Sequence, residues 1–136
     1  MKSRADSFRE TRKIHRQYES AEDYTELVAD LIKSQGKARV CDIAREMGVS
    51  HVTVLKTIKK LIRDGYLIKN SELSLTEKGK VMATFSKKKH LVLSTFLLKL
   101  GVPEHIVATD VEGIEHHISN ATLDAIEAHL KMIADL

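Results

Sequence analysis

Residues 40–64 read VCDIAREMGVSHVTVLKTIKKLIRD, and this stretch decides the expected fold of the chain. Its first eight residues suit a short helix, and Gly48-Val49 suits a tight turn. Ser50 is a favourable N-cap for a second helix that runs to about Asp64. Two helices joined by so short a turn are typical of a helix-turn-helix, which places its second helix in the major groove of DNA.

The second helix of this motif divides into an apolar and a polar face. Val54, Ile58 and Leu61 recur at helical spacing, which predicts that they face the core. The opposite side carries polar and cationic side chains, which can bind base edges near the start of the helix and phosphates elsewhere. Together with two cations just before the motif, the candidate DNA contacts are Lys37, Arg39, Ser50, His51, Thr53, Lys56 and Lys60.

The segments on either side of the motif extend this pattern to a winged domain. Residues 66–69 and 73–76 alternate like two short strands around the turn 70–72, which predicts a small hairpin or wing. The tip of this hairpin lacks Arg and Lys, so contact between the hairpin and DNA is not expected.

Before the motif, Ser20 is the expected N-cap of a helix that ends near Gly36 and carries an apolar stripe of Tyr24, Leu27, Val28, Leu31 and Ile32. Residues 1–19 are polar and rich in arginine, and we expect a flexible basic arm there.

The second half of the chain is expected to be all helical. One helix starts at Thr76 or Ser74, and between residues 90 and 100 it is apolar on nearly every side. Such a helix must be buried, and in a short chain a second copy of the protein is the simplest cover. The expected dimerisation residues are Leu91, Leu93, Phe96, Leu97 and Leu100. After Gly101-Val-Pro103, a helix with Val107, Val111, Ile114 and Ile118 turned inward is expected, followed by a last helix near 121–133.

Composition and charge narrow the function classes. The chain has 136 residues, one proline, no tryptophan and a single cysteine, Cys41, which cannot form an internal disulfide. It lacks an apolar run of signal-peptide or membrane-spanning length, so a cytoplasmic location is expected. The formal charge of +3 hides an asymmetry. Residues 37–69 hold eight Lys and Arg against three Asp and Glu, whereas residues 101–136 hold one Lys against seven acidic residues. This division predicts a polyanion partner for the basic part and a cation for the acidic part.

The acidic part contains half of a candidate metal site. Residues 110–117 read DVEGIEHH, and on a helix Glu112, Glu115 and His116 fall at i, i+3 and i+4, on one face. Further donors are Asp23 and Glu26, at helical spacing in the first helix, and His90. Simpler roles compete with this interpretation. Thr109 with Glu112 and Ser20 with Asp23 resemble helix-capping boxes, and a lone His90 could be an ordinary interfacial histidine.

The donor types indicate the class of ion. Carboxylates and imidazoles without thiolate suit Mn(II) or Fe(II), and the lack of clustered cysteine argues against structural zinc. Asp23, Glu26, Glu112 and Glu115 would carry four negative charges, which two divalent cations per subunit would neutralise. Without metal these charges repel one another, and the two helices that carry them should drift apart.

Four segments together resemble the diphtheria toxin repressor family of metal-dependent repressors. They are Asp23-Tyr-Thr-Glu26, residues 38–44 (ARVCDIA), residues 75–79 (LTEKG) and residues 110–117. The resemblance implies a homodimer of winged helix-turn-helix domains that binds a pseudo-palindromic operator only when metal is bound. The implied metal ligands are Asp23, Glu26, His90, Glu112, Glu115 and His116. The iron-responsive branch of the family has Met where Asp23 stands and Cys where Glu112 stands, so oxygen donors at both positions favour manganese.

The expected architecture is therefore mostly α-helical. A flexible arm (1–19) precedes a winged helix-turn-helix domain (20–76) and a helical metal-binding and dimerisation domain (77–136). The expected function is a manganese-responsive transcriptional regulator, a repressor of metal-uptake genes, in which Mn(II) fixes the DNA-binding geometry of the dimer. An iron-responsive regulator and a metal-independent DNA-binding protein are the alternatives. A di-metal enzyme is not expected, because the chain lacks the paired Glu-x-x-His motifs of helix-bundle di-iron enzymes.

Overall fold

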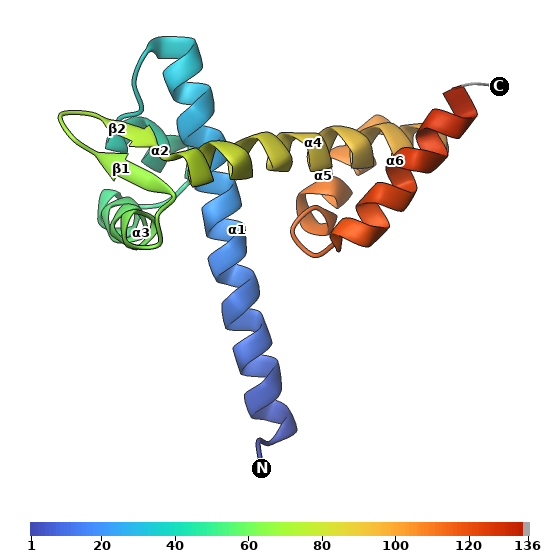
Figure 1. The fold of residues 1–136 in the computed structure, drawn as a ribbon, viewed down its shortest axis with the longest axis horizontal. Helices are drawn as coiled ribbons and strands as arrows, with labels where there is room; N and C mark the ends of the chain where they lie inside the picture. The colour runs from blue at the N-terminus through green and yellow to red at the C-terminus, as the bar shows by residue number, and fades with distance from the viewer. Residues whose placement is uncertain (135–136) are drawn as a thin grey trace. The chain divides into compact units, whose positions relative to one another are not determined.

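The computed structural model describes residues 1–134, apart from the side chains of residues 14–18. The described chain forms six helices and one two-stranded antiparallel sheet (Figure 1). In chain order they are α1 (Arg4–Gln35), α2 (Val40–Met47), α3 (His51–Arg63), β1 (Leu67–Lys69), β2 (Leu73–Leu75), α4 (Glu77–Lys99), α5 (Glu104–Ile114) and α6 (Asn120–Ala134). This order confirms the expected fold class of a winged helix-turn-helix followed by helices. Residues 135 and 136, the end of the expected second domain, lie outside the described residues.

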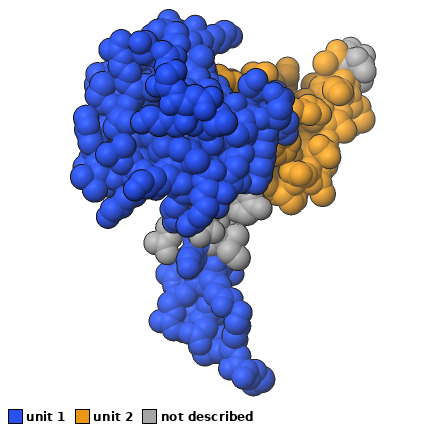
Figure 2. Space-filling view, turned by 60° about the vertical axis from the view of Figure 1, so that its left-hand side comes forward, with its two compact units in different colours: residues 1–84 blue, residues 85–136 orange. Residues whose placement is uncertain are grey.

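The chain divides into two compact units, coloured separately in Figure 2. Unit 1 is Met1–Thr84 and unit 2 is Phe85–Leu136, so the division falls inside α4. Unit 1 extends beyond residue 76, the expected end of the DNA-binding domain, because the first turns of α4 pack on it. Met82 packs against the core of unit 1, and Ala83 is buried.

The core of unit 1 joins the second half of α1 to the helix-turn-helix. Val28 from α1, Ile43 from α2 and Val54 from α3 are fully shielded from solvent, and Leu67 of the hairpin packs with them. Val28 and Val54 belong to the helix faces that helical spacing predicted to be apolar. The inward orientation predicted for Val54, Ile58 and Leu61 is confirmed.

Local sequence explains how the helix-turn-helix forms. Gly48 ends α2 with a left-handed backbone (φ 68°), which glycine adopts without steric cost, and its N–H donates to the carbonyl of Ala44. Two residues later, the Ser50 hydroxyl accepts a hydrogen bond from the backbone N–H of Thr53 at 3.2 Å and caps α3. Both predicted boundaries of the turn are thus confirmed.

The hairpin and the start of α4 are held together by one threonine and one glycine. Leu67 pairs with Leu75, and Lys69 pairs with Leu73. Thr76 then caps α4, because its hydroxyl accepts from the Gly79 N–H at 3.1 Å. A Cβ atom on Gly79 would clash with the carbonyl oxygen of Tyr66, the residue before β1, so only glycine allows α4 to lie this close to the start of the hairpin. Of the two predicted starts of α4, Thr76 is the correct one.

The beginning of the chain differs from the expectation. The prediction that the first helix starts at Ser20 is wrong, since α1 begins at Arg4 and Ser3 caps it by accepting from the Asp6 N–H at 3.1 Å. Residues 4–19 are therefore the first turns of α1 rather than an irregular arm, and residues 1–13 are exposed throughout. Side-chain contacts such as the Arg9–Asp6 ion pair support this segment locally. The side chains of residues 14–18, which the expected arm includes, lie outside the described residues.

Unit 2 has a smaller core, formed by the later turns of α4 with α5 and α6. Its buried members are Val92, Leu93, Val107, Val111 and Leu123. The predicted inward orientation of Ile114 is wrong, because this side chain is 39% exposed at the last residue of α5.

Among residues 1–134, each helix is too short or too polar to cross a membrane.

Candidate metal centre and nucleic-acid interface

The start of α3 presents side chains of the kind that read DNA bases. His51 and Thr53 are exposed there, directly after the capping Ser50. Val52, between them, is 61% exposed, and sequence reasoning missed it because an apolar residue in a helix is expected to face the core. An exposed valine at this position can contact the methyl group of thymine, while hydroxyl and imidazole groups can hydrogen bond to base edges. Side chains at this end of α3 can therefore make both polar and apolar contacts to bases.

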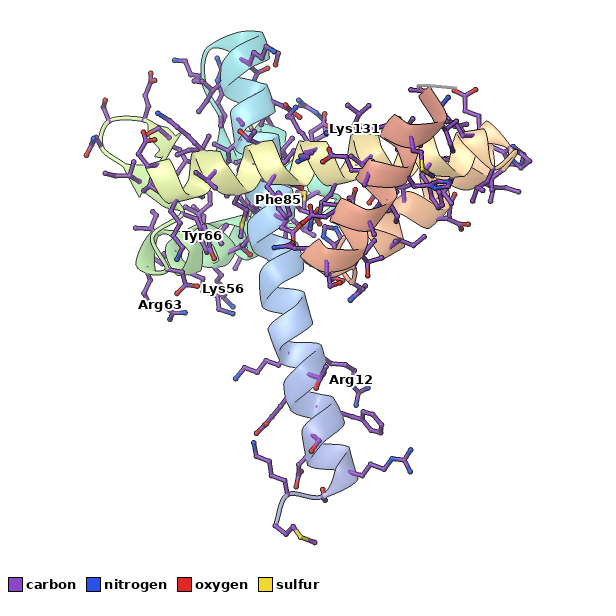
Figure 3. The ribbon with its side chains drawn as sticks, turned by 45° about the vertical axis from the view of Figure 1, so that its right-hand side comes forward. Arg12, Lys56, Arg63, Tyr66, Phe85 and Lys131 are labelled. Atoms are coloured by element: carbon purple, nitrogen blue, oxygen red, sulfur yellow. The ribbon has the colours of Figure 1, made fainter. Side chains whose placement is uncertain are left out.

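Exposed cations lie along α3 and in the loop before α2. Lys56 and Lys60 are exposed along α3, and Figure 3 shows Lys56 and Arg63 projecting outward from that helix. Lys37 and Arg39 lie in the exposed loop between α1 and α2, within the same unit. Cations in this arrangement can bind phosphates on both sides of a groove, which fixes the position of a helix on the duplex.

Glu115 is the centre of the candidate metal site in unit 2. Glu115 occupies the C-cap position of α5, where its backbone N–H donates to the Val111 carbonyl. Only 5% of the residue is exposed. One carboxylate oxygen, Oε2, lies 3.0 Å from Nδ1 of His90 on α4. The other, Oε1, lies 3.7 Å from Nε2 of the neighbouring His116. Two imidazoles and one carboxylate thus meet at the junction of α4 and α5.

Burial raises the pKa of Glu115 above the ordinary glutamate value. The hydrogen bond and charge of His90 and the charge of His116 oppose this rise, whereas the carboxylate of Glu112 adds to it. A buried carboxylate with another carboxylate nearby is destabilised in its charged form. A bound cation would stabilise that form, so the electrostatics of this site fit a metal.

The structure removes the simpler explanation for two of the other predicted ligands. Glu112 lies in the last turn of α5, and Thr109 is inside that helix, whose N-cap is Pro103, so the two do not form a capping box. Asp23 lies in the middle of α1, and Ser20 precedes it within the same helix, so the second proposed box is also wrong. Neither carboxylate caps the start of a helix.

The six predicted ligands are divided between the two units. His90, Glu112, Glu115 and His116 belong to unit 2, where the contacts of Glu115 bring them together. Asp23 and Glu26 belong to unit 1, three residues apart on α1, and both side chains are partly buried. The full set consists of carboxylate oxygens and imidazole nitrogens, a donor set that fits Mn(II) or Fe(II).

The predicted dimerisation residues have different environments. Leu91 is 67% exposed and Leu100 is also exposed, whereas Phe96 and Leu97 are partly buried. Leu93 is only 3% exposed because it packs into the core of its own unit, so its assignment to a surface for a second copy is wrong. Leu98, which the prediction left out, is exposed on the same helix.

Two family models together match most of the chain. One, described as the iron dependent repressor N-terminal DNA binding domain, matches residues 17–75. The other, described as the iron dependent repressor metal binding and dimerisation domain, matches residues 76–135.

Curated relatives and solved structures agree with these matches. The chain is 43% identical over 122 residues to the transcriptional regulator MntR of Escherichia coli O6:H1, covering 88% of this chain and 78% of that protein. It is 42% identical over 109 residues to the HTH-type transcriptional regulator MntR of Lysinibacillus sphaericus, covering 79% and 78%. A solved manganese-dependent transcriptional repressor in complex with manganese is similar at 30% identity with a TM-score of 0.73. That match covers 82% of this chain but only 52% of the solved one, so this chain spans about half the length of that structure.

Proposed function

Since the chain belongs to the iron dependent repressor family, we propose that it is a manganese-responsive, DNA-binding transcriptional repressor that acts as a homodimer. The observation that carries this proposal is the buried Glu115 with His90 and His116 around it, in a chain that also holds a helix-turn-helix. Relatives named MntR, and the solved repressor that contains manganese, support manganese as the ion. Fe(II) is the second candidate, because the same donors accept it and the family models are described as iron dependent.

The proposed metal ligands are Asp23, Glu26, His90, Glu112, Glu115 and His116. The bound ion supplies positive charge that neutralises the carboxylates of this set. Glu115 provides a carboxylate already desolvated and oriented by His90, and His116 provides a nitrogen donor beside it. Four carboxylates in the set would neutralise two divalent ions per subunit. Asp23 and Glu26 come from unit 1, so the complete set ties the DNA-binding unit to unit 2.

This link gives the metal control over DNA binding without direct contact between metal and DNA. Two recognition helices in a dimer must lie about 34–36 Å apart to enter successive major grooves of a pseudo-palindromic operator. When the metal fixes unit 1 to unit 2, other orientations lose population and the operator-binding arrangement gains it. The proposed DNA-binding domain is residues 20–76, and the proposed metal-binding and dimerisation domain is residues 77–136, close to the two family matches.

The proposed DNA contacts divide into two roles. Ser50, His51 and Thr53 at the start of α3 read bases, and Lys37, Arg39, Lys56 and Lys60 bind phosphates. Leu91, Phe96, Leu97 and Leu100 form the proposed dimer surface. The protein acts in the cytoplasm on genes for metal uptake, and it binds the ion as an effector without catalysing a reaction.

A DNA-binding titration tests this function. Operator duplex, selected from a random library by the manganese-loaded protein, is titrated at fixed ionic strength with Mn(II), Fe(II) or Zn(II), since salt alone shifts affinity steeply. We expect Mn(II) to raise operator affinity by about 5- to 150-fold, the usual range of allosteric coupling. An affinity that is the same with and without every metal would contradict the proposal, and stimulation by Fe(II) alone would assign the protein to iron.

A further inference from the structure

A cavity of about 320 Å³ lies in unit 1 between the loop before α2, the helix α3 and the hairpin. The buried residues of its wall are apolar, namely Ala38, Ile58 and Leu73. Its exposed charged residues are Lys37, Arg39, Lys69 and Glu72. A hollow with apolar walls and three cations against one carboxylate is suited to an anion.

Arg39 stands at the start of a helix without capping it through its side chain. It occupies the N-cap of α2 with an extended backbone (φ −97°, ψ 148°). An N-cap usually carries Ser, Thr, Asp or Asn, whose oxygen accepts from the first-turn N–H groups. The helix dipole also disfavours cations at this end, and Lys37 is only two residues earlier. The carboxylate of Asp42 in the first turn of α2 already attracts the Arg39 charge, and a bound anion at the start of α2 would add to this stabilisation.

The third cation comes from the hairpin. Lys69 is the last residue of β1, pairs with Leu73, and lines the same cavity as Lys37 and Arg39. The sequence indicated that the hairpin tip lacks a cation, and residues 70–72 do lack one. The cation directly before the tip was missed, because a lysine at the end of a predicted strand gives no sign of its neighbours across the fold.

Glu72 is the counter-ion inside this cavity. Its Oε1 lies 3.9 Å from Nζ of Lys37, and about half of each side chain is exposed. An ion pair of such length and exposure contributes little to stability, so another anion can replace it at low cost. Lys37 can therefore exchange its intramolecular partner for a ligand.

We propose that this cavity holds a backbone phosphate of the bound DNA, with Lys69 as a DNA contact and Glu72 as an internal competitor for Lys37. The inference rests on the proposed DNA-binding function and extends the interface to the hairpin. Two observations identify DNA as the occupant. The cavity carries an excess of positive charge, and it lies next to the proposed reading surface of α3. Leu55 of α3 lines the cavity and lies four residues after His51, on the same face of the helix, so the cavity adjoins the proposed reading surface. A phosphate contact here fixes the register of α3 without reading sequence.

The test compares salt dependence among exposed charge variants of the manganese-loaded, full-length protein. The probes are the selected operator duplex and a random-sequence duplex, and the readout is fluorescence anisotropy across a range of salt concentrations. Lys69→Gln removes the proposed contact, Glu72→Gln removes the competitor, and Lys131→Gln on α6 is the control for loss of one exposed lysine (Figure 3). Thermal melts confirm that each variant is folded.

For Lys69→Gln we expect weaker binding to both duplexes. The slope of log affinity against log salt concentration should become shallower by about 0.9 per subunit, because one phosphate contact is lost. For Glu72→Gln we expect binding tightened by about twofold to fivefold. A Lys69→Gln variant that matches Lys131→Gln in affinity and slope overturns this inference, as does a Glu72→Gln variant that binds no more tightly than wild type. If the wild-type protein fails to bind either duplex with metal present, the proposed function itself fails, so the two failures are distinguishable.

Discussion

Unit 1 and unit 2 differ in the size of their hydrophobic cores and in the partners of their buried polar groups. Among the described residues, unit 1 joins twelve buried hydrophobic residues in one cluster, whereas unit 2 has five. In unit 1 the buried hydroxyl of Thr25 donates to the Ala21 carbonyl at 2.7 Å, and the buried carboxylate of Asp42 accepts hydrogen bonds from Gln35 and Arg45. In unit 2 the buried carboxylate of Glu115 lies beside the imidazoles of His90 and His116, and Leu91 and Leu100 are exposed.

This difference shows which parts of the protein depend on something outside the subunit. A segment as small as unit 2 has a core that gives only marginal stability by itself. Its buried carboxylate is suited to a cation, and its exposed leucines are suited to a second copy. Unit 1 can fold as a DNA-binding module, and unit 2 is the part where metal and dimerisation add stability.

The largest effect should follow removal of Glu115. In Glu115→Ala, loss of the central carboxylate should abolish the increase in operator affinity with Mn(II), a change of about 5- to 150-fold. Non-specific DNA binding, which depends on unit 1, should stay within about twofold of wild type. The matched control is Asp124→Ala on α6, an exposed acidic residue of the same unit. Full metal stimulation in Glu115→Ala, measured by anisotropy, would show that unit 2 does not respond to metal through this carboxylate.

The second prediction concerns exposed apolar residues on α4. Leu91→Ser should weaken the dimer by about 1.5–3 kcal/mol for each buried leucine, because that burial is lost in both copies. Val81→Ser is the control, since Val81 is 69% exposed on the same helix but lies in unit 1. Sedimentation velocity should show Leu91→Ser dissociating at concentrations where wild type and Val81→Ser stay dimeric. Equal behaviour of the two variants would contradict a dimer surface in unit 2.

The third prediction is that the two units unfold separately without metal. Calorimetry of the metal-free protein should show two transitions, with unit 2 melting first because its core is smaller. At a hundred times its dissociation constant, Mn(II) should add about 2.7 kcal/mol and merge the transitions. Asp23→Asn should keep them apart in the presence of metal. A single transition in metal-free protein would contradict the independence of the two units.

The smallest effect should be the pH dependence set by Glu115. Because the pKa of Glu115 is raised in the folded protein, ionisation of this carboxyl destabilises the metal-free fold. That contribution is fully favourable below the unfolded pKa and is lost as pH rises through the folded pKa. Metal binding requires the carboxylate, so Mn(II) affinity should fall with decreasing pH, starting at a higher pH than for an ordinary glutamate. Calorimetric titrations at several pH values measure this, and an affinity that is constant through the acidic range would contradict it.

The sequence predicted the winged helix-turn-helix closely because its signals are local. Gly48 and Ser50 set the turn through their own backbone and side chain, and Thr76 does the same for α4. The start of α1 was missed because Ser20 resembles a cap, while Ser3 and nearby ion pairs support an earlier start. Local pattern cannot rank two serines that both precede helix-forming residues.

The candidate site was predictable in its residue types but only partly in its geometry. The spacing of Glu112, Glu115 and His116 placed them on one face, yet it could not show that Glu115 is buried while Glu112 is exposed. The contact with His90 depends on the packing of α5 against α4, which no local spacing encodes. Leu93 shows the same limit, because apolar character alone does not distinguish a subunit core from a dimer surface.

The most direct measurement is electron–nuclear double resonance of the full-length protein loaded with Mn(II) and labelled with ¹³C at the aspartate carboxyl groups. If one ion is held by residues of both units, the spectrum should contain a ¹³C coupling that disappears in Asp23→Asn and persists in Asp30→Asn, a control on the same helix. The same sample should contain nitrogen couplings from His90 and His116, one of which disappears in His116→Gln. A nitrogen coupling without any ¹³C coupling that depends on Asp23 would contradict the account.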